Sequence, residues 1–321
     1  MSLFRSVRAV ASSSSGDGVI DWHAVAEAAK GATDPGSVRL TDAEKAGYAT
    51  DVRDARDRVR EVAGIDFDVP RTIEIQHRHH WIDANIDTFR RVLHPLEAQE
   101  GSMFPGLART VNTGTMSFML GFLARNVLGQ YDPLLLAGDE VDADHALYFV
   151  HPNIDRVAHA LDVDYPRFRR WIAFHEVTHA AEFGAAPWLS EYLESRMEEG
   201  LAELKHGQLD REAFREMNAA MTVVEGYAEL LMDHAFDDEY EDLRRKVDAR
   251  RKGAGPLSKL AKRLLGLGLK RQQYERGKDF FEYVAAERGI AAAGVVWDGP
   301  ENLPTEEELE SPRKWIARVN P

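Results

Sequence analysis

Two histidines and a glutamate in the order His175-Glu176-x-x-His179 are the residues best suited to chemistry in this chain. Residues four apart on a helix share a face, so His175 and His179 can both turn an imidazole nitrogen toward one metal ion. Glu176 projects beside that face, where it can take a proton from a water bound to the metal. Zinc suits this set, because it accepts imidazole and carboxylate ligands tetrahedrally and leaves a fourth position for water. We therefore predict zinc as the cofactor and Glu176 as the catalytic general base.

The sequence before the motif is typical of a helix. Asp164 can cap a helix N-terminus, and Pro166 fits the first turn. Apolar residues then recur at helical spacing up to the motif: Phe168, Trp171, Ile172 and Phe174. The two histidines are thus predicted to share one helix face.

A third metal ligand is expected downstream, in a second helical segment over residues 221–233. Glu225 and Glu229 lie four apart in this otherwise apolar run. A carboxylate in such a run is costly to bury unless it is paired or bound to metal. Asp233 and His234 are weaker alternatives as ligands. The sequence therefore offers a carboxylate to complete a three-ligand site.

The pair Glu225-Gly226 resembles the third-ligand segment of the gluzincin metallopeptidases. In that group the first glutamate binds zinc, and an acidic residue four positions later hydrogen-bonds a ligand histidine. The resemblance implies that His175, His179 and Glu225 hold the metal and that Glu229 orients one of the histidines, as outer partners do in metal sites.

Composition narrows the class of protein further. The 321 residues are 44% hydrophobic, which is enough for a substantial core, and the net charge of −14 argues against nucleic-acid and anionic-membrane partners. There are no cysteines, hence no thiolate ligands. We find no apolar run long enough to cross a bilayer and no continuous apolar stretch typical of a signal peptide. We expect a cytoplasmic protein without stable membrane association.

Hydrophobic periodicity predicts a mainly α fold with a small β-sheet, of the α+β class. Residues 1–18, with their serine run, are expected to form a flexible arm, and residues 19–321 a single domain. Helices are predicted from Asp21 to about 30, from a Thr41 capping box to about 62, over 114–128, 189–205 and 211–236, and as an exposed helix within 237–252. A break at 253–256 precedes a basic amphipathic helix over 257–270. The segment 270–321, rich in Pro and Trp, is expected to pack on the core as an irregular tail.

Three short segments are strand candidates: 72–76, 134–137 and 146–150. Residues 129–133 carry a turn signal instead. Segment 146–150 precedes the motif helix and could be the edge strand that pairs with a substrate backbone, although an ordinary core strand explains it equally well.

Three histidines at positions 77, 79 and 80 invite a second metal site. No carboxylate is placed to finish such a site, so we interpret them as surface or structural histidines.

A wider set of residues resembles one family. The set contains Arg78, Trp81 and Asn85, the segment 128–132, Pro152-Asn153, Glu225-Gly226, and the tail segments 273–277 and 303–305. Together they resemble a zincin-like family of actinobacterial and archaeal zinc metallopeptidases or hydrolases, some of which are associated with coenzyme F-420 biosynthesis. The resemblance implies a zincin-like metallopeptidase fold built around the motif helix. Members often have histidine where this chain has Tyr227.

These observations lead to a functional hypothesis. The chain is expected to hydrolyse peptide bonds of a peptide or protein substrate, with zinc-activated water and Glu176 as general base. Tyr227 and Tyr192 are candidates to stabilise the oxyanion. The alternatives are a non-catalytic zinc-containing scaffold or partner-binding protein, or a metallohydrolase acting on a small amide in coenzyme metabolism.

Overall fold

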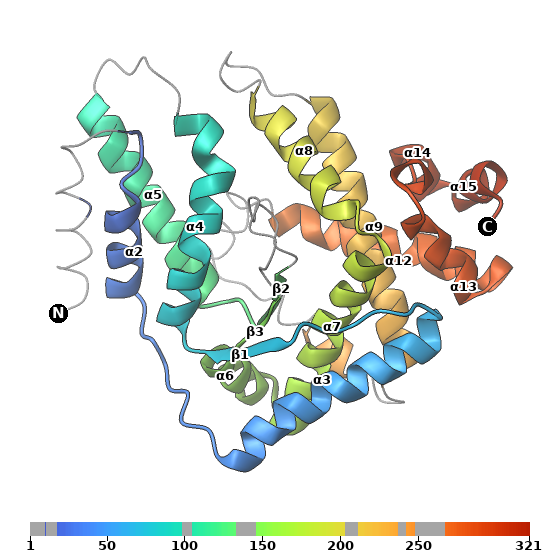
Figure 1. The fold of residues 1–321 in the computed structure, drawn as a ribbon, viewed down its shortest axis with the longest axis horizontal. Helices are drawn as coiled ribbons and strands as arrows, with labels where there is room; N and C mark the ends of the chain where they lie inside the picture. The colour runs from blue at the N-terminus through green and yellow to red at the C-terminus, as the bar shows by residue number, and fades with distance from the viewer. Residues whose placement is uncertain are drawn as a thin grey trace.

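The fold is mainly helical with one small mixed sheet, as the sequence predicts (Figure 1). The computed structural model describes Val10 and residues 18–97, 105–132, 146–202, 211–236, 242–247 and 267–321. The longer helices are α2 (Trp22–Gly31), α3 (Asp42–Ala63), α4 (Arg78–Glu97), α5 (Pro105–Ala124), α6 (His151–Leu161), α7 (Tyr165–Ala185), α8 (Leu189–Ala202), α9 (Arg211–Ala235) and α12 (Leu267–Arg288). Short ones follow: α13 (Ile290–Ala293), η2 (Gly294–Trp297), η3 (Pro300–Asn302), α14 (Glu306–Glu310) and α15 (Pro312–Val319). None of these helices is both long and apolar enough to span a membrane.

The sheet has the order β1-β3-β2, in which β1 (Thr72–Gln76) runs parallel to β3 (Ala146–Val150) and β2 (Gly129–Asp132) runs antiparallel to it. The strands at 72–76 and 146–150 are confirmed. One prediction was wrong. The expected turn at 129–133 contains the strand β2, because its backbone pairs with β3. Of the two interpretations of 146–150, the structure supports the core strand, since β3 is central and not an edge strand. The candidate at 134–137 lies outside the described residues.

Helix α7 begins where the sequence predicts and runs through the core. The Asp164 side chain accepts a hydrogen bond from the Arg167 N–H at 3.0 Å, and Pro166 lies in the first turn. Both features stabilise the first turn, since its N–H groups have no partner within the helix. Most of α7 is buried, including residues 171–174 just before the motif. The motif histidines thus lie in a rigid, well-packed element.

Helix α3 packs along α7 and is joined to it by a buried ion pair. Its N-terminus has the predicted capping box of Thr41 and Glu44. In the middle of α3, Asp51 accepts a hydrogen bond from Arg169 Nε at 2.7 Å, with both side chains nearly buried. The guanidinium lies over the ring of Tyr48 and leaves no room for a side chain at Gly47. Because both charges are paired, α3 and α7 are held in one register.

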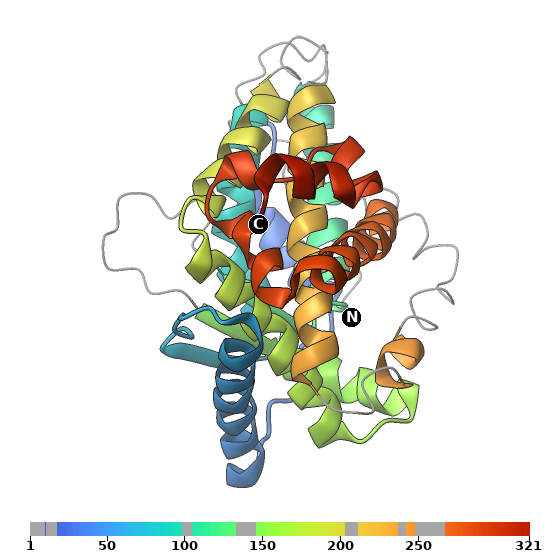
Figure 2. The same ribbon diagram turned by 90° about the vertical axis from the view of Figure 1, so that its right-hand side faces the viewer.

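Helix α12 lies against α9, the helix that carries Glu225 (Figure 2). At the crossing, a side chain on Gly226 would collide with the backbone of Gly277, and one on Gly277 would collide with the carbonyl oxygen of Thr222. The two helices therefore approach at a distance that only glycine permits. Near the end of α9, Lys278 adds an ion pair to Asp233 at 2.6 Å.

The C-terminal segment differs from the expected irregular tail. It consists of α12 followed by five short helices, with Trp297 and Trp315 buried in the main core. Proline and tryptophan start and anchor these short helices, which is why the composition suggested irregular structure. Residues 242–247 are helical as expected, but Leu243 and Val247 are buried and the segment is not simply exposed.

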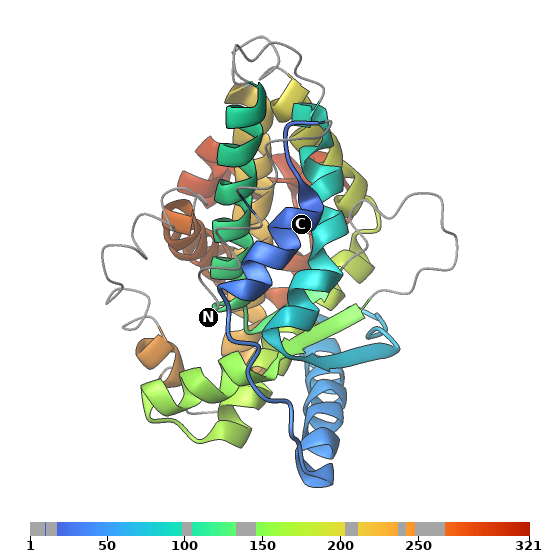
Figure 3. The ribbon, with the colours of Figure 1, turned by 90° about the vertical axis from the view of Figure 1, so that its left-hand side faces the viewer.

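A second, smaller core joins α2, α4 and α5 on the opposite side of the molecule (Figure 3). Helix α5 spans Pro105–Ala124, so it begins and ends earlier than the predicted 114–128. Apart from Val10 and Gly18, the arm 1–18 lies outside the described residues, as do the break at 253–256 and nearly all of the basic segment 257–270.

Candidate metal centre

Helices α7 and α9 bring His175, His179 and Glu225 together. Each offers one ligand atom, and these atoms lie within 4.8 Å of one another. Glu225 is only 4% exposed, and both histidines are partly buried. Two imidazoles and one carboxylate are the donor set of catalytic zinc sites, in which a fourth position stays open. Within the described part of the chain, this is the one group of His, Asp and Glu side chains placed to hold a metal.

Neighbouring side chains fix the orientation of both histidines. The ring of His175 stacks on Trp171, with centroids 5.9 Å apart and planes 7° from parallel. His179 Nδ1 lies 2.8 Å from Oε2 of Glu182, a fully buried carboxylate one turn further along α7. A carboxylate accepts a hydrogen bond, so Nδ1 donates a proton to Glu182 and Nε2 is the nitrogen left to bind a metal, which would displace its proton.

Burial and charge act in opposite directions on His179. Burial disfavours the imidazolium, but Glu182 outweighs it, with smaller contributions from Glu225 and Glu176, and the pKa of His179 is raised. For the Glu182 carboxyl the effects are reversed: burial raises its pKa, and the neighbouring His179 lowers it, with burial the larger effect. Three carboxylates around one imidazole stabilise positive charge at this point of the core. The residues present therefore fit a bound divalent cation.

Glu176 lies beside the ligand group and is held by strand β2. Its Oε2 accepts a hydrogen bond from the backbone N–H of Tyr131 at 3.0 Å. A Cβ on Gly129 would come within 2.6 Å of both Cγ and Oε1 of Glu176. Only glycine at this position lets the strand approach the carboxylate so closely. Glu176 is thus fixed from outside its own helix.

Strand β2 is in turn fixed by α4. Trp81 Nε1 donates to Oε1 of Gln130 at 2.7 Å, and Gln130 Nε2 donates to Oδ1 of Asn85 at 3.0 Å. Asn85 also donates to the Trp81 carbonyl. Two of the residues on which the family resemblance rests, Trp81 and Asn85, therefore position the strand that holds Glu176.

The remaining candidates from α9 have other neighbours. Glu229 is buried, and its Oε2 lies 3.3 Å from Arg244 Nε; its predicted contact with a ligand histidine stays a prediction. Asp233 pairs with Lys278, and His234 Nδ1 lies 2.9 Å from the Leu230 carbonyl oxygen. Neither of these two alternatives joins the ligand group found among the described residues.

The two tyrosines proposed to stabilise the oxyanion, and the histidines at 77, 79 and 80, make packing contacts or hydrogen bonds with neighbouring residues. Tyr227 is fully buried against Phe281 and Trp297, and burial raises its pKa. Tyr192 packs on Trp188. In the cluster after β1, His79 Nε2 lies 2.7 Å from the Thr33 carbonyl oxygen and His77 Nδ1 accepts from the His80 N–H. Among the described residues, no group placed to hold a metal includes these histidines.

Sequence reasoning missed three features of the site: Glu182, Gly129 and the Tyr131 N–H. Glu182 had a signal, since it is a carboxylate in the apolar run after the motif, three residues beyond His179. The argument applied to Glu225 and Glu229 applies to it equally. Gly129 and Tyr131 lie in segment 128–132, which contributes to the family resemblance, but their role could not be derived from it because that role depends on strand β2 reaching α7.

Comparison with known proteins agrees with the geometry. The model of a family described as zincin-like metallopeptidases matches residues 20–208 and 193–316, and the chain belongs to this family. A crystal structure from Chloroflexus aurantiacus, described as "a putative hydrolase with a novel fold", is 30% identical to this chain. The similarity covers 99% of this chain and 98% of that one, with a TM-score of 0.73. No curated protein matches the chain.

Proposed function

We propose that the chain is a zinc-dependent metallopeptidase that hydrolyses peptide bonds. The observation that carries this proposal is the convergence of His175, His179 and Glu225 beside Glu176, a buried carboxylate outside the ligand group. A structural metal site needs only its ligands. A carboxylate held by a separate strand next to those ligands serves proton transfer instead.

His175, His179 and Glu225 would hold the zinc ion, with Glu182 keeping His179 in the tautomer that binds metal. Zinc bound there supplies Lewis acidity, which acidifies water and polarises a carbonyl group. Glu176 takes a proton from the attacking water and delivers it to the leaving amine. The Tyr131 N–H donates to Oε2 of Glu176 and so holds the carboxylate in place for this proton transfer.

If the protein were a non-catalytic scaffold, its metal site would be expected to have a fourth protein ligand, as structural zinc sites do. Asp233 and His234, the nearest alternatives in sequence, are engaged elsewhere. Membership of a metallopeptidase family supports the catalytic proposal as well.

The test begins with the zinc content of untagged protein purified without added metal, for which we expect about one zinc per chain. The protein is then incubated with a peptide mixture of known sequences, and the products are identified by mass spectrometry. Glu176→Gln should keep the zinc and reduce hydrolysis by about 10²- to 10⁴-fold. Glu191→Gln, on exposed α8 surface, is the matched control. Wild-type hydrolysis by Glu176→Gln would refute the role of this residue, and zinc-loaded protein that cleaves no peptide would refute the peptidase proposal.

A further inference from the structure

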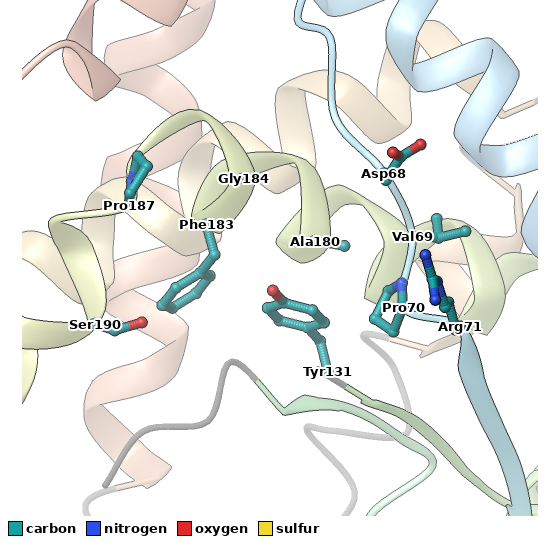
Figure 4. A pocket seen from close by; sticks show the side chains of 10 residues that line it. All are labelled: Asp68, Val69, Pro70, Arg71, Tyr131, Ala180, Phe183, Gly184, Pro187 and Ser190. Atoms are coloured by element: carbon teal, nitrogen blue, oxygen red, sulfur yellow. The ribbon is translucent and has the colours of Figure 1, made fainter. Parts of the chain in front are cut away.

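A cavity of about 420 Å³ lies beside β2 and the C-terminal half of α7 (Figure 4). Its walls come from three places: the chain before β1, strand β2, and α7 with the start of α8. The lining residues are Asp68, Val69, Pro70, Arg71, Tyr131, Ala180, Phe183, Gly184, Pro187 and Ser190. This volume is at the lower end of pockets that hold small molecules, and it is sufficient for one large side chain.

The cavity continues the face of α7 that carries Glu176. Ala180 and Phe183 follow Glu176 by four and seven residues, so they lie on the same helix face in the next two turns. Tyr131 connects the two places from the strand side. Its backbone N–H bonds Glu176, while its side chain forms a wall of the cavity. A substrate whose scissile bond lies at Glu176 would therefore place a neighbouring side chain here.

Aliphatic and aromatic side chains form one continuous part of the cavity wall, and polar atoms contribute nearly half of its surface. The rings of Tyr131 and Phe183 lie 5.6 Å apart at 48°, and Figure 4 shows Tyr131 between Phe183 on one side and Pro70 on the other. Tilted ring pairs of this kind accept a third aromatic ring favourably. Of the two charged residues, Asp68 is exposed and already paired with Arg60 at 3.1 Å, and Arg71 is exposed too. Both charged side chains are exposed, so the part of the wall formed by Tyr131, Phe183 and Pro70 is the part suited to an apolar side chain.

We propose that this cavity is the specificity pocket of the enzyme and takes a large apolar side chain, aromatic above all, next to the bond that is cleaved. The proposal specifies the proposed peptidase function further, and it rests on that function because the bound side chain would belong to a peptide substrate. The pocket itself can be tested by binding alone, so the two can fail separately.

The binding test uses two probes, acetyl-Gly-Phe-Gly-amide and acetyl-Gly-Ala-Gly-amide, titrated into the zinc-loaded Glu176→Gln variant by calorimetry. Burying the phenyl ring should make the first probe bind about 10- to 100-fold more tightly than the second. Ser190→Trp, added to this variant, fills the cavity from α8 and should abolish the difference. Ser195→Trp, one and a half turns further along α8 and outside the lining, is the matched control and should preserve it. Phe183→Ala removes one aromatic wall and should reduce the difference about tenfold.

The corresponding turnover test maps cleavage sites in the peptide mixture with wild-type protein. We expect large apolar residues to be enriched at one position beside the cleaved bond, and Ser190→Trp to remove the enrichment while cleavage at small residues continues. Equal binding of the two probes, or an unchanged preference in both Ser190→Trp and Phe183→Ala, would overturn the pocket. Selective binding without cleavage of any peptide would support the pocket and refute the peptidase function.

Discussion

Replacing Gly129 with alanine tests whether strand β2 positions Glu176, the proposed catalytic base. The added Cβ would lie 2.6 Å from Cγ and Oε1 of Glu176. Carbon atoms in favourable contact are about 3.5 Å apart, so either the carboxylate or the strand must move by roughly 1 Å. A displacement of about 1 Å can cost an enzyme about 100-fold in rate. We expect kcat/KM to fall by about that factor, while the zinc content is unchanged because no ligand atom is touched.

The assay measures hydrolysis of the best-cleaved peptide from the mixture, with zinc content and thermal unfolding recorded for the same samples. Gly121→Ala in α5 is the control, since its Cβ would meet Thr33 Oγ1 at 3.1 Å, the Ala29 carbonyl oxygen at 3.6 Å and an Arg125 nitrogen at 3.7 Å, and none of these belongs to the metal centre. A Gly129→Ala variant that is folded, loaded with zinc and as fast as wild type would show that Glu176 does not depend on the strand. Loss of zinc in that variant would also refute the reasoning, because it would mean that the ligands moved.

Three further predictions concern the surroundings of the site. Gly226→Ala should destabilise the protein by about 1–3 kcal/mol or more, because the new methyl meets the backbone of Gly277; an unchanged midpoint in urea unfolding would contradict the close crossing of α9 and α12. Glu182→Gln should weaken zinc binding by about 10- to 100-fold, since the charged partner of His179 is lost; competition with a chelator measures this, and wild-type affinity would rule out the orienting role. Burial by itself would raise the pKa of Glu308, but its arginine partner on α15 and the helix cap lower it below the ordinary 4.5. Its contribution to stability is therefore present above about pH 4.5 and is lost as the pH falls through the lowered pKa. Glu308→Gln should flatten the decline of unfolding free energy in that acid range, and an unaltered slope would show that the ion pair contributes nothing.

The sequence was most informative where chemistry depends on spacing within one helix. Asp164, Pro166 and the apolar positions define α7, and the two histidines then share a face by geometry alone. The cost of burying a carboxylate pointed to Glu225 and Glu229, and the resemblance to the gluzincin segment selected Glu225, which in the structure lies beside both histidines. The mainly helical class followed from the same periodicity.

The sequence failed where the outcome depends on which elements meet. The strand order β1-β3-β2 cannot be read from segments of five residues, so the sequence left open whether 146–150 is an edge strand or a core strand. Gly129 and Tyr131 read locally as part of a turn, because glycine favours turns and the partner strand is distant in the chain. Their function appears only when β2 reaches Glu176. The C-terminal helices were missed for a related reason, since Trp297 and Trp315 derive their order from the core.

The glycine contact between α9 and α12 has a consequence for biosynthesis. Helix α9, which carries Glu225, emerges from the ribosome before α12, its partner at Gly226 and Gly277. Until residues 267–288 leave the exit tunnel, α9 lacks its tightest neighbour. Glu225, the proposed third metal ligand, is then not yet fixed against the two histidines. We expect a nascent chain to complete the proposed metal centre only after synthesis has passed α12.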